Sequence, residues 1–300
     1  MAVSQITVQK EYEKVSNIKP EDVQRLRDWL QTQGHLPAHH ITDLDIILAY
    51  HSCDCDAEVT KRVIDLNFTA RTLFSFYQNR EINKSLETAL QTWLVTPLDA
   101  ATKKGYRPVY CQLLDADPDK FVYSDVVKAF VMIFDLWQHE EGTIPGLVVI
   151  LNMDKVSLGH ISGVNLKVAQ EYFYFLQEAM FVRLKGFYFI NAPSYMDRLL
   201  TMIKPFMKKD MLDMVKICPV GSNALDEVFP IAALPKDAGG ENKHSSVLKD
   251  EILNKLKNNK DFFDMESKKR VDETKRTEQP KTISSFFPNM EETFNNLEID

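Results

Sequence analysis

Residues 181–194 read Phe181-Val182-Arg183-Leu184-Lys185-Gly186-Phe187-Tyr188-Phe189-Ile190-Asn191-Ala192-Pro193-Ser194, and this stretch decides the fold. Its middle part, 185–190, is dominated by aromatic and branched apolar side chains and is predicted to be a strand. Residues 193–207 are predicted to be helical, with Pro205 bending or ending the helix. The stretch is therefore a strand that leads directly into a helix.

The same alternation of strand and helix continues around this stretch. Residues 107–114 and 146–153 are predicted strands, and the second is an unbroken apolar run, as expected of a strand covered on both faces. Residues 123–138 and 164–182 are predicted helices, and 214–218 is a short fourth strand. Strands that alternate with helices predict an α/β fold with a mostly parallel sheet.

The two ends of the chain differ from this middle part. Residues 20–79 are predicted to be helical, because proline and acidic residues at 20–22 suit the first turn of a helix and apolar residues then recur at helical spacing. One amphipathic helix is predicted over 247–256, followed by extended or loosely docked chain. We therefore expect an all-helical N-terminal domain at 1–90, an α/β domain at 91–240 and a C-terminal helix and tail at 241–300.

Composition excludes several classes of protein. The 300 residues carry a net charge of −7 and lack the basic stripe typical of a nucleic-acid binder. The four cysteines do not form a disulfide framework, residues 1–10 lack a secretion signal, and the longest uncharged apolar stretch, 142–153, is too short to span a bilayer. We expect a cytoplasmic monomer that binds no nucleic acid.

The sequence lacks the common catalytic motifs. It contains no dinucleotide-binding glycine pattern, no P-loop and no nucleophile elbow. Residues 51–55 bring one histidine and two cysteines together, but zinc needs four ligands, and a turn between helices explains these residues better. We therefore expect no cofactor, no metal and no enzymatic activity. The alternative is an enzyme on an apolar small molecule, with His160, Asp154 or Tyr172 as acid–base groups.

Two features have more than one explanation on residues alone. The helices at 123–138 and 164–182 are apolar nearly all round, which suits either a tight core or the wall of an apolar ligand cavity. Basic residues stand before the strand at 185–190 and after the helix at 193–207. Such charges usually face solvent, but they also suit a phosphate headgroup or an anionic membrane.

Several motifs, taken in order, resemble one known family. Residues 181–194 are similar to the PVRLKGIHFINAPS signature of CRAL-TRIO proteins, and 203–207 (IKPFM) to their IKPFL. Further similarities are LRDWL at 26–30, Gly221-Ser222, Leu234-Pro235-Lys236 and Gly239-Gly240, and, to the arthropod branch, residues 261–263, 270–276 and 297–300. The resemblance therefore spans nearly the whole chain.

The resemblance implies a helical N-terminal domain packed on an α/β domain whose sheet floors an apolar pocket, with a mobile helix as the gate. The pocket positions that it implies are Val127, Phe130, Val131, Phe134, Leu147, Leu151, Tyr172, Phe175, Leu176 and Phe187. The gate positions share one stripe of a helix over 194–207 and are Met196, Leu199, Leu200, Ile203 and Met207.

This chain departs from the family's pattern at several of these positions. Tocopherol-binding members have serines where this chain has Phe130 and Phe134, so we expect a ligand of different shape. Tyr172 has the only polar tip among the pocket positions and is expected to hydrogen-bond a ligand hydroxyl or carbonyl. Two basic positions of the family's phosphoinositide cluster are Leu212 and Met214 here. The basic residues available for such a contact are Arg183, Lys185, Lys208, Lys209 and Lys216.

The predicted function is to bind one hydrophobic small molecule, of the retinoid, tocopherol, carotenoid or terpenoid class, and to transfer it between membranes. Burial drives binding, because each CH₂ group removed from water contributes about 0.8 kcal/mol. The partners are then the ligand itself, a transient membrane surface and phosphoinositides. An alternative from another class is a phosphoinositide-responsive membrane adaptor.

Overall fold

The computed structural model describes residues 2–15 and 17–288. At its centre is a five-stranded sheet in the order β1-β2-β3-β4-β5, where β1 and β2 are antiparallel and the other neighbours are parallel. The strands are β1 (Trp93–Pro97), β2 (Arg107–Leu113), β3 (Leu147–Asn152), β4 (Leu184–Ala192) and β5 (Val215–Pro219). The predicted α/β class with a mostly parallel sheet is confirmed.

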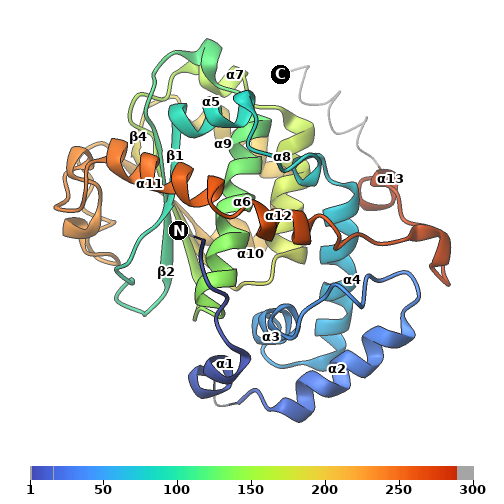
Figure 1. Cartoon of the computed structure of the whole chain (residues 1–300). Helices are drawn as coiled ribbons and strands as arrows, with labels where there is room; N and C mark the ends of the chain where they lie inside the picture. The colour runs from blue at the N-terminus through green and yellow to red at the C-terminus, as the bar shows by residue number, and fades with distance from the viewer. Residues whose placement is uncertain (1, 16, 289–300) are drawn as a thin grey trace.

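The helices fall into three groups along the chain (Figure 1). The N-terminal group, in blue, comprises α1 (Val8–Lys14), α2 (Pro20–Thr32), α3 (Asp43–Ser52) and α4 (Ala57–Leu73). The middle group comprises α5 (Lys84–Thr92), α6 (Tyr123–Glu141), α7 (Leu158–Ser162), α8 (Leu166–Tyr174) with a π-helical turn (Phe175–Ala179), α9 (Met196–Ile203) and α10 (Lys209–Met214). The last group, in orange and red, comprises α11 (Ser245–Lys257), α12 (Lys260–Glu266) and α13 (Ile283–Phe286). Among the described residues, none of these helices is long and apolar enough to cross a bilayer.

Local side-chain chemistry sets where the N-terminal helices begin. Pro20 occupies the first turn of α2, and the Asp22 carboxylate accepts a hydrogen bond from the Lys19 N–H (3.2 Å). At α3, Thr42 and Asp45 form a capping box in which each side chain accepts from the other's backbone N–H (2.7 and 3.2 Å). These contacts satisfy N–H groups that a helix terminus leaves unpaired.

The central strands send alternate side chains to the two faces of the sheet. On one face, Val149 and Phe187 belong to the core that also contains α6, α8 and α9. On the other face, Tyr110, Ile150 and Ile190 pack under the segment between β5 and α11. Both faces are therefore covered, and the cavity described below lies on the first of them.

Residues 84–97, for which the sequence predicts no element, form α5 and the edge strand β1. The apolar run of β1 is only five residues long and follows its helix without a break, so composition does not mark it as a strand. The short helices α7, α10 and α12 are also unpredicted, because helices of five to seven residues show little periodicity.

A buried carboxylate joins the N-terminal part to the α/β domain. Glu11 of α1 is fully buried, and its Oε2 accepts from the backbone N–H and the hydroxyl of Thr143 (3.1 and 2.6 Å). Gly142, next to Thr143, has a φ of +74°, and a Cβ at this position would lie 1.9 Å from Glu11 Oε1. Glycine is therefore required for this close approach.

The C-terminal segment returns across the molecule to the N-terminal helices (Figure 1). Arg276 Nη1 lies 2.9 Å from the Asp65 carboxylate of α4, and Lys281 pairs with the same carboxylate. The expectation of loosely docked chain after 257 is therefore wrong for 258–288, since α12 and these ion pairs hold this segment in place. The similarity noted at 297–300 lies outside the described residues.

Candidate functional site

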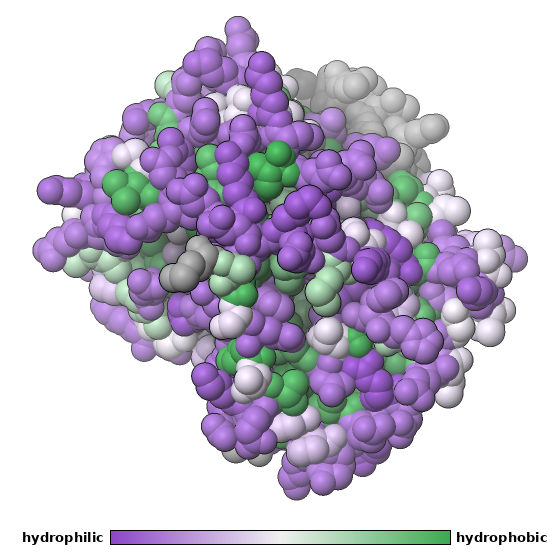
Figure 2. Space-filling model, in the orientation of Figure 1, coloured by the Kyte–Doolittle hydropathy of each residue, from purple (hydrophilic) through white to green (hydrophobic). Residues whose placement is uncertain are grey.

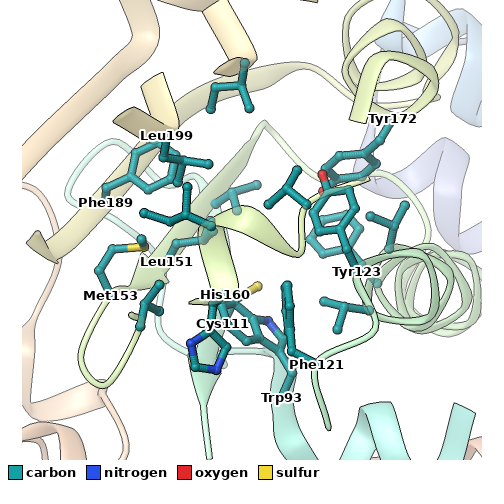
Figure 3. Close-up of a pocket in the computed structure, with 18 of the residues that line it drawn as sticks. Trp93, Cys111, Phe121, Tyr123, Leu151, Met153, His160, Tyr172, Phe189 and Leu199 are labelled. Atoms are coloured by element: carbon teal, nitrogen blue, oxygen red, sulfur yellow. The ribbon is translucent and has the colours of Figure 1, made fainter. Parts of the chain in front are cut away.

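An apolar cavity of about 120 Å³ lies between the sheet and helices α6, α8 and α9 (Figure 3). Its floor follows from the strand register, because residues paired across a sheet point to the same face. Cys111, Leu151 and Phe189 are register partners across β2, β3 and β4, and all three line the cavity. Val149 and Phe187, two residues earlier on β3 and β4, extend this floor.

One stripe of α6 forms a wall of the cavity. Tyr123, Val126, Val127 and Phe130 line it and are spaced i, i+3, i+4 and i+7, which places them on the same helical face. Beyond them, the Phe134 ring stacks parallel to the Phe130 ring with centroids 6.4 Å apart. Of this aromatic pair, Phe130 lines the cavity and Phe134 lies in the core next to it.

Helices α8 and α9 complete the enclosure. Tyr172 and Phe173 face the cavity from α8, and Leu199 and Ile203, one turn apart, face it from α9. The opposite face of α9, which includes Arg198, is exposed to solvent. A single helix thickness therefore separates this side of the cavity from water.

The ionisable groups that line the cavity stay uncharged near neutral pH. Burial raises the pKa of the Cys111 thiol to about 12, although a hydrogen bond from Trp93 acts in the opposite direction. Burial also raises the pKa of Tyr123 and Tyr172 above their ordinary value, and it lowers the pKa of His160. The site therefore suits an uncharged, largely apolar molecule.

The structure brings together about half of the predicted pocket and gate positions. Those that line the cavity are Val127, Phe130, Leu151, Tyr172, Phe187, Leu199 and Ile203. Those that lie in the surrounding core instead are Val131, Phe134, Leu147, Phe175, Leu176, Met196, Leu200 and Met207. On a helix buried all round, spacing alone does not separate side chains that face a cavity from those that face a neighbouring element.

Many lining residues were not predicted. They are Trp93, Val95, Cys111, Phe121, Tyr123, Val126, Val149, Met153, Val156, His160, Ile161, Val164, Phe173 and Phe189. The two-residue period of a strand places Val149 beside Leu151 and Phe189 beside Phe187, so these two were within reach of the sequence. Trp93 and Val95 belong to the unpredicted strand β1, and 153–164 form a connection whose path no periodicity reveals.

The other groups considered for chemistry lie apart from the cavity, except His160 and Tyr172. The histidine and cysteines of 51–55 form the turn between α3 and α4, where Asp54 and Cys55 have positive φ values. Across residues 2–15 and 17–288, no three metal-binding side chains come close enough to hold an ion. Asp154 is exposed and is not a lining residue.

The five basic residues proposed for membrane contact are spread over the surface. Arg183 donates to the His51 carbonyl (3.0 Å) and pairs with Asp54 (3.1 Å), so it is engaged by the N-terminal part. Lys208 pairs with Glu178 (2.5 Å), and Lys209 pairs with an aspartate one turn along α10. Lys185 and Lys216 are exposed, and among the described residues neither forms an ion pair. Glu178 lines the same surface hollow as Arg183 and Lys208. Its negative charge lowers the attraction of this hollow for phosphate.

Two family models match this chain. Residues 92–240 match the model described as CRAL/TRIO domain, and residues 15–86 match the model described as Pinta-like, UBA domain. The first covers the sheet and the cavity, and the second covers α2, α3 and α4.

The individual relatives share a low sequence identity with this chain. The chain is 23% identical over 232 residues to the "Alpha-tocopherol transfer protein-like" protein of Homo sapiens and 24% identical over 234 residues to that of Mus musculus, covering 74% of this chain and 66% of each relative. It is 21% identical over 223 residues to "Clavesin-1" of Xenopus laevis, covering 73% of this chain and 67% of the relative. The matched part thus spans just under two thirds of the first two relatives. Among solved structures, that of Sfh5 aligns with a TM-score of 0.42 and 14% identity, covering 82% of this chain and 96% of that one.

Proposed function

The CRAL/TRIO domain at 92–240 makes this chain a member of that family, and from this premise we propose that the chain binds one hydrophobic small molecule in the cavity under α9 and transfers it between membranes. The observation that supports this proposal is a cavity lined almost entirely by apolar side chains, whose ionisable groups are all neutral. Proteins named for tocopherol transfer are among the relatives. The molecule is of the retinoid, tocopherol, carotenoid or terpenoid class, and the protein is a cytoplasmic, monomeric carrier rather than an enzyme.

The cavity volume requires α9 to move during loading. At about 120 Å³, the cavity is comparable to an engineered cavity of about 150 Å³ that holds a single benzene ring. Pockets for whole lipids and drug-sized ligands have volumes of roughly 300–1,000 Å³. In the closed arrangement the site therefore has room for one ring of the ligand, and the remainder requires that α9 swing outward.

The contacts of α9 are suited to such a movement. Before the helix, the Tyr195 hydroxyl donates to the Val156 carbonyl, and after it Gln177 donates to the Phe206 carbonyl (2.9 Å) and accepts from the Lys208 N–H (2.6 Å). Between these two anchors, α9 is held mainly by apolar side chains such as Leu199 and Ile203. Outward movement exposes this apolar stripe, which favours exchange of the ligand at a membrane surface.

The identity of the bound molecule is the decisive test. The whole chain is purified without detergent, and native mass spectrometry is expected to find one apolar molecule per chain, released by organic extraction. The Val127→Phe variant fills the cavity with an uncharged side chain and should lose this molecule at a modest loss of stability, about 1–3 kcal/mol for overpacking. Repeated extraction without any lipid, together with no binding from a panel of retinoids, tocopherols and terpenoids, would rule out the carrier function.

A further inference from the structure

The sequence 157–160 fixes the orientation of a histidine at the end of the cavity. Ser157 is the N-cap of α7, and the His160 side chain reaches back to it in a capping box. The Ser157 backbone N–H donates to His160 Nδ1 (3.1 Å), and the Ser157 hydroxyl lies 2.8 Å from the same atom. A backbone N–H can only donate, so Nδ1 must be the unprotonated nitrogen of the ring.

The remaining ring nitrogen must then carry the proton. A neutral imidazole has one donor nitrogen and one acceptor nitrogen, so Nε2 is the N–H donor. Burial lowers the pKa of His160, although Asp117 and Asp115 act in the opposite direction, so the neutral form is present at neutral pH. His160 is thus held as a fixed Nε2–H donor.

This donor has no partner in the protein. The His160 side chain is 2% exposed, and Nε2 is buried without a hydrogen bond to any described residue. Its ring packs edge-on against Phe121, with centroids 5.4 Å apart, and Figure 3 shows it beside Trp93 and Cys111 at the end of the cavity away from Tyr172. An unpaired buried N–H is unfavourable, and an acceptor on a guest molecule would offset this cost.

We propose that the His160 Nε2–H reads the ligand by donating a hydrogen bond to an uncharged acceptor oxygen, so that the site selects apolar molecules with a carbonyl, ether or hydroxyl group over pure hydrocarbons and over carboxylates. This proposal rests on the carrier function proposed above and names the chemistry of its ligand. A hydrocarbon leaves the N–H unpaired. A carboxylate brings a charge that one neutral donor in an apolar cavity does not stabilise.

His160 differs from the two cavity tyrosines in its pre-set direction. A tyrosine hydroxyl rotates and can either donate or accept, so Tyr123 and Tyr172 tolerate several ligand groups. The imidazole is fixed by the capping box and can only donate through Nε2. Specificity for an acceptor oxygen therefore resides at the His160 end of the cavity.

The test compares two probes that differ by one heavy atom, acetophenone and ethylbenzene, of which only the first has an acceptor oxygen. Their dissociation constants are measured by NMR titration of the whole chain and of two variants. In His160→Asn the side-chain oxygen can still accept from the Ser157 N–H, but the N–H donor at the Nε2 position is lost. In His160→Gln the amide N–H can reach the Nε2 position, while the cap contact is lost. We expect the affinity ratio of acetophenone to ethylbenzene to fall roughly tenfold in His160→Asn and to be largely kept in His160→Gln.

Nitrogen NMR of the imidazole supplies a second readout. The Nε2-protonated form is expected at neutral pH, and the Nε2 proton signal should move on addition of acetophenone but not of ethylbenzene. An affinity ratio that is the same in all three proteins would overturn the role of His160 and leave the carrier function standing. Failure of both probes to bind, with no extracted lipid, would overturn both proposals.

Discussion

Two hollows among the described residues have opposite chemistry. The larger, about 540 Å³, lies between α3, α6 and α12, where the surface in Figure 2 is recessed, and charged residues such as Arg71, Asp135 and Glu266 line it. The smaller, about 120 Å³, is the neutral apolar cavity under α9. Size alone would select the first as the ligand site. The lining chemistry selects the second, because a lipid gains only where it meets no charge.

The charged hollow is a junction between three parts of the chain. Arg71 of α4 contacts Asp135 of α6 (3.1 Å) and Glu266 of α12 (3.0 Å). Lys269, just after α12, contacts Asp45 of α3 (2.8 Å) and Glu266 (2.5 Å). These charges are nearly fully buried and satisfy one another, so they fix how the N-terminal helices, the α/β domain and the C-terminal segment fit together. The comparison teaches that one hollow holds the protein together with charges, whereas the other is lined by neutral, mostly apolar groups, as the proposed ligand requires.

Removing Arg71 should give the largest effect. Arg71→Met leaves Asp135 and Glu266 buried without this partner, so the free energy of unfolding should fall by about 3–5 kcal/mol. Chemical denaturation measures this loss, and any folded fraction should still bind ligand, because Arg71 does not line the apolar cavity. In the double variant Arg71→Met/Glu266→Met, part of the loss should be recovered. A loss below 1 kcal/mol in the single variant would show that the junction is not held by these charges.

Replacing Phe134 by a smaller residue should change the space next to the cavity and leave the charges of the protein unaltered. Phe134→Ala removes the ring that stacks on Phe130 and should lower the free energy of unfolding by about 3 kcal/mol. The space released adjoins the cavity, so ligands longer by several carbons should bind more tightly than they bind the unaltered chain. Phe68→Ala is the matched control, because Phe68 is equally buried but belongs to the N-terminal core. The Phe68→Ala variant should lose stability but keep the ligand length preference of the unaltered chain. The same ligand length preference in both variants would contradict the position of Phe134 beside the cavity.

The sequence predicted the two regions unequally, and the reason is physical. The fold class followed from the strand–helix alternation, and the α9 positions Leu199 and Ile203 followed from the resemblance to CRAL-TRIO proteins. Predicting the residues of the pocket floor requires the register of the strands, which periodicity gives only in part. Leu151 and Phe187 were predicted, but their neighbour Phe189 was not. His160 was considered only as an acid–base group of the alternative enzyme, because its place beside the cavity depends on the path of a connection.

The charged junction could not be predicted from the sequence at all. Arg71 and Glu266 are separated by 195 positions, and nothing local marks them as partners. Charged residues are usually exposed, so burial of this set is visible only once α4, α6 and α12 are brought together. The family of this chain was therefore easier to predict than the contacts that hold its parts in place.

Acid should weaken the charged junction. Burial alone would raise the pKa of Glu266, but Lys269 and Arg71 lower it to about 2. A folded pKa below the unfolded value means that this stabilisation is present above about pH 4.5 and is lost as pH falls toward 2. The contribution is on the order of 3 kcal/mol. Between pH 6 and 2, the free energy of unfolding should fall as the pH falls. This pH dependence should be weaker in Glu266→Gln and unchanged in Asp264→Asn, which replaces an exposed acid on the same helix.

An exposed ion pair should give the smallest effect and complete the comparison. Lys209 and Asp213 are 2.6 Å apart, as close as the buried pairs, but both side chains are largely exposed to solvent. Water already solvates and screens these charges, so Lys209→Met should leave the free energy of unfolding almost unchanged. Arg71→Met and Lys209→Met thus each replace the basic residue of an ion pair by methionine, and the two pairs differ mainly in burial. Equal losses at 209 and 71 would mean that burial is not what gives the junction its strength.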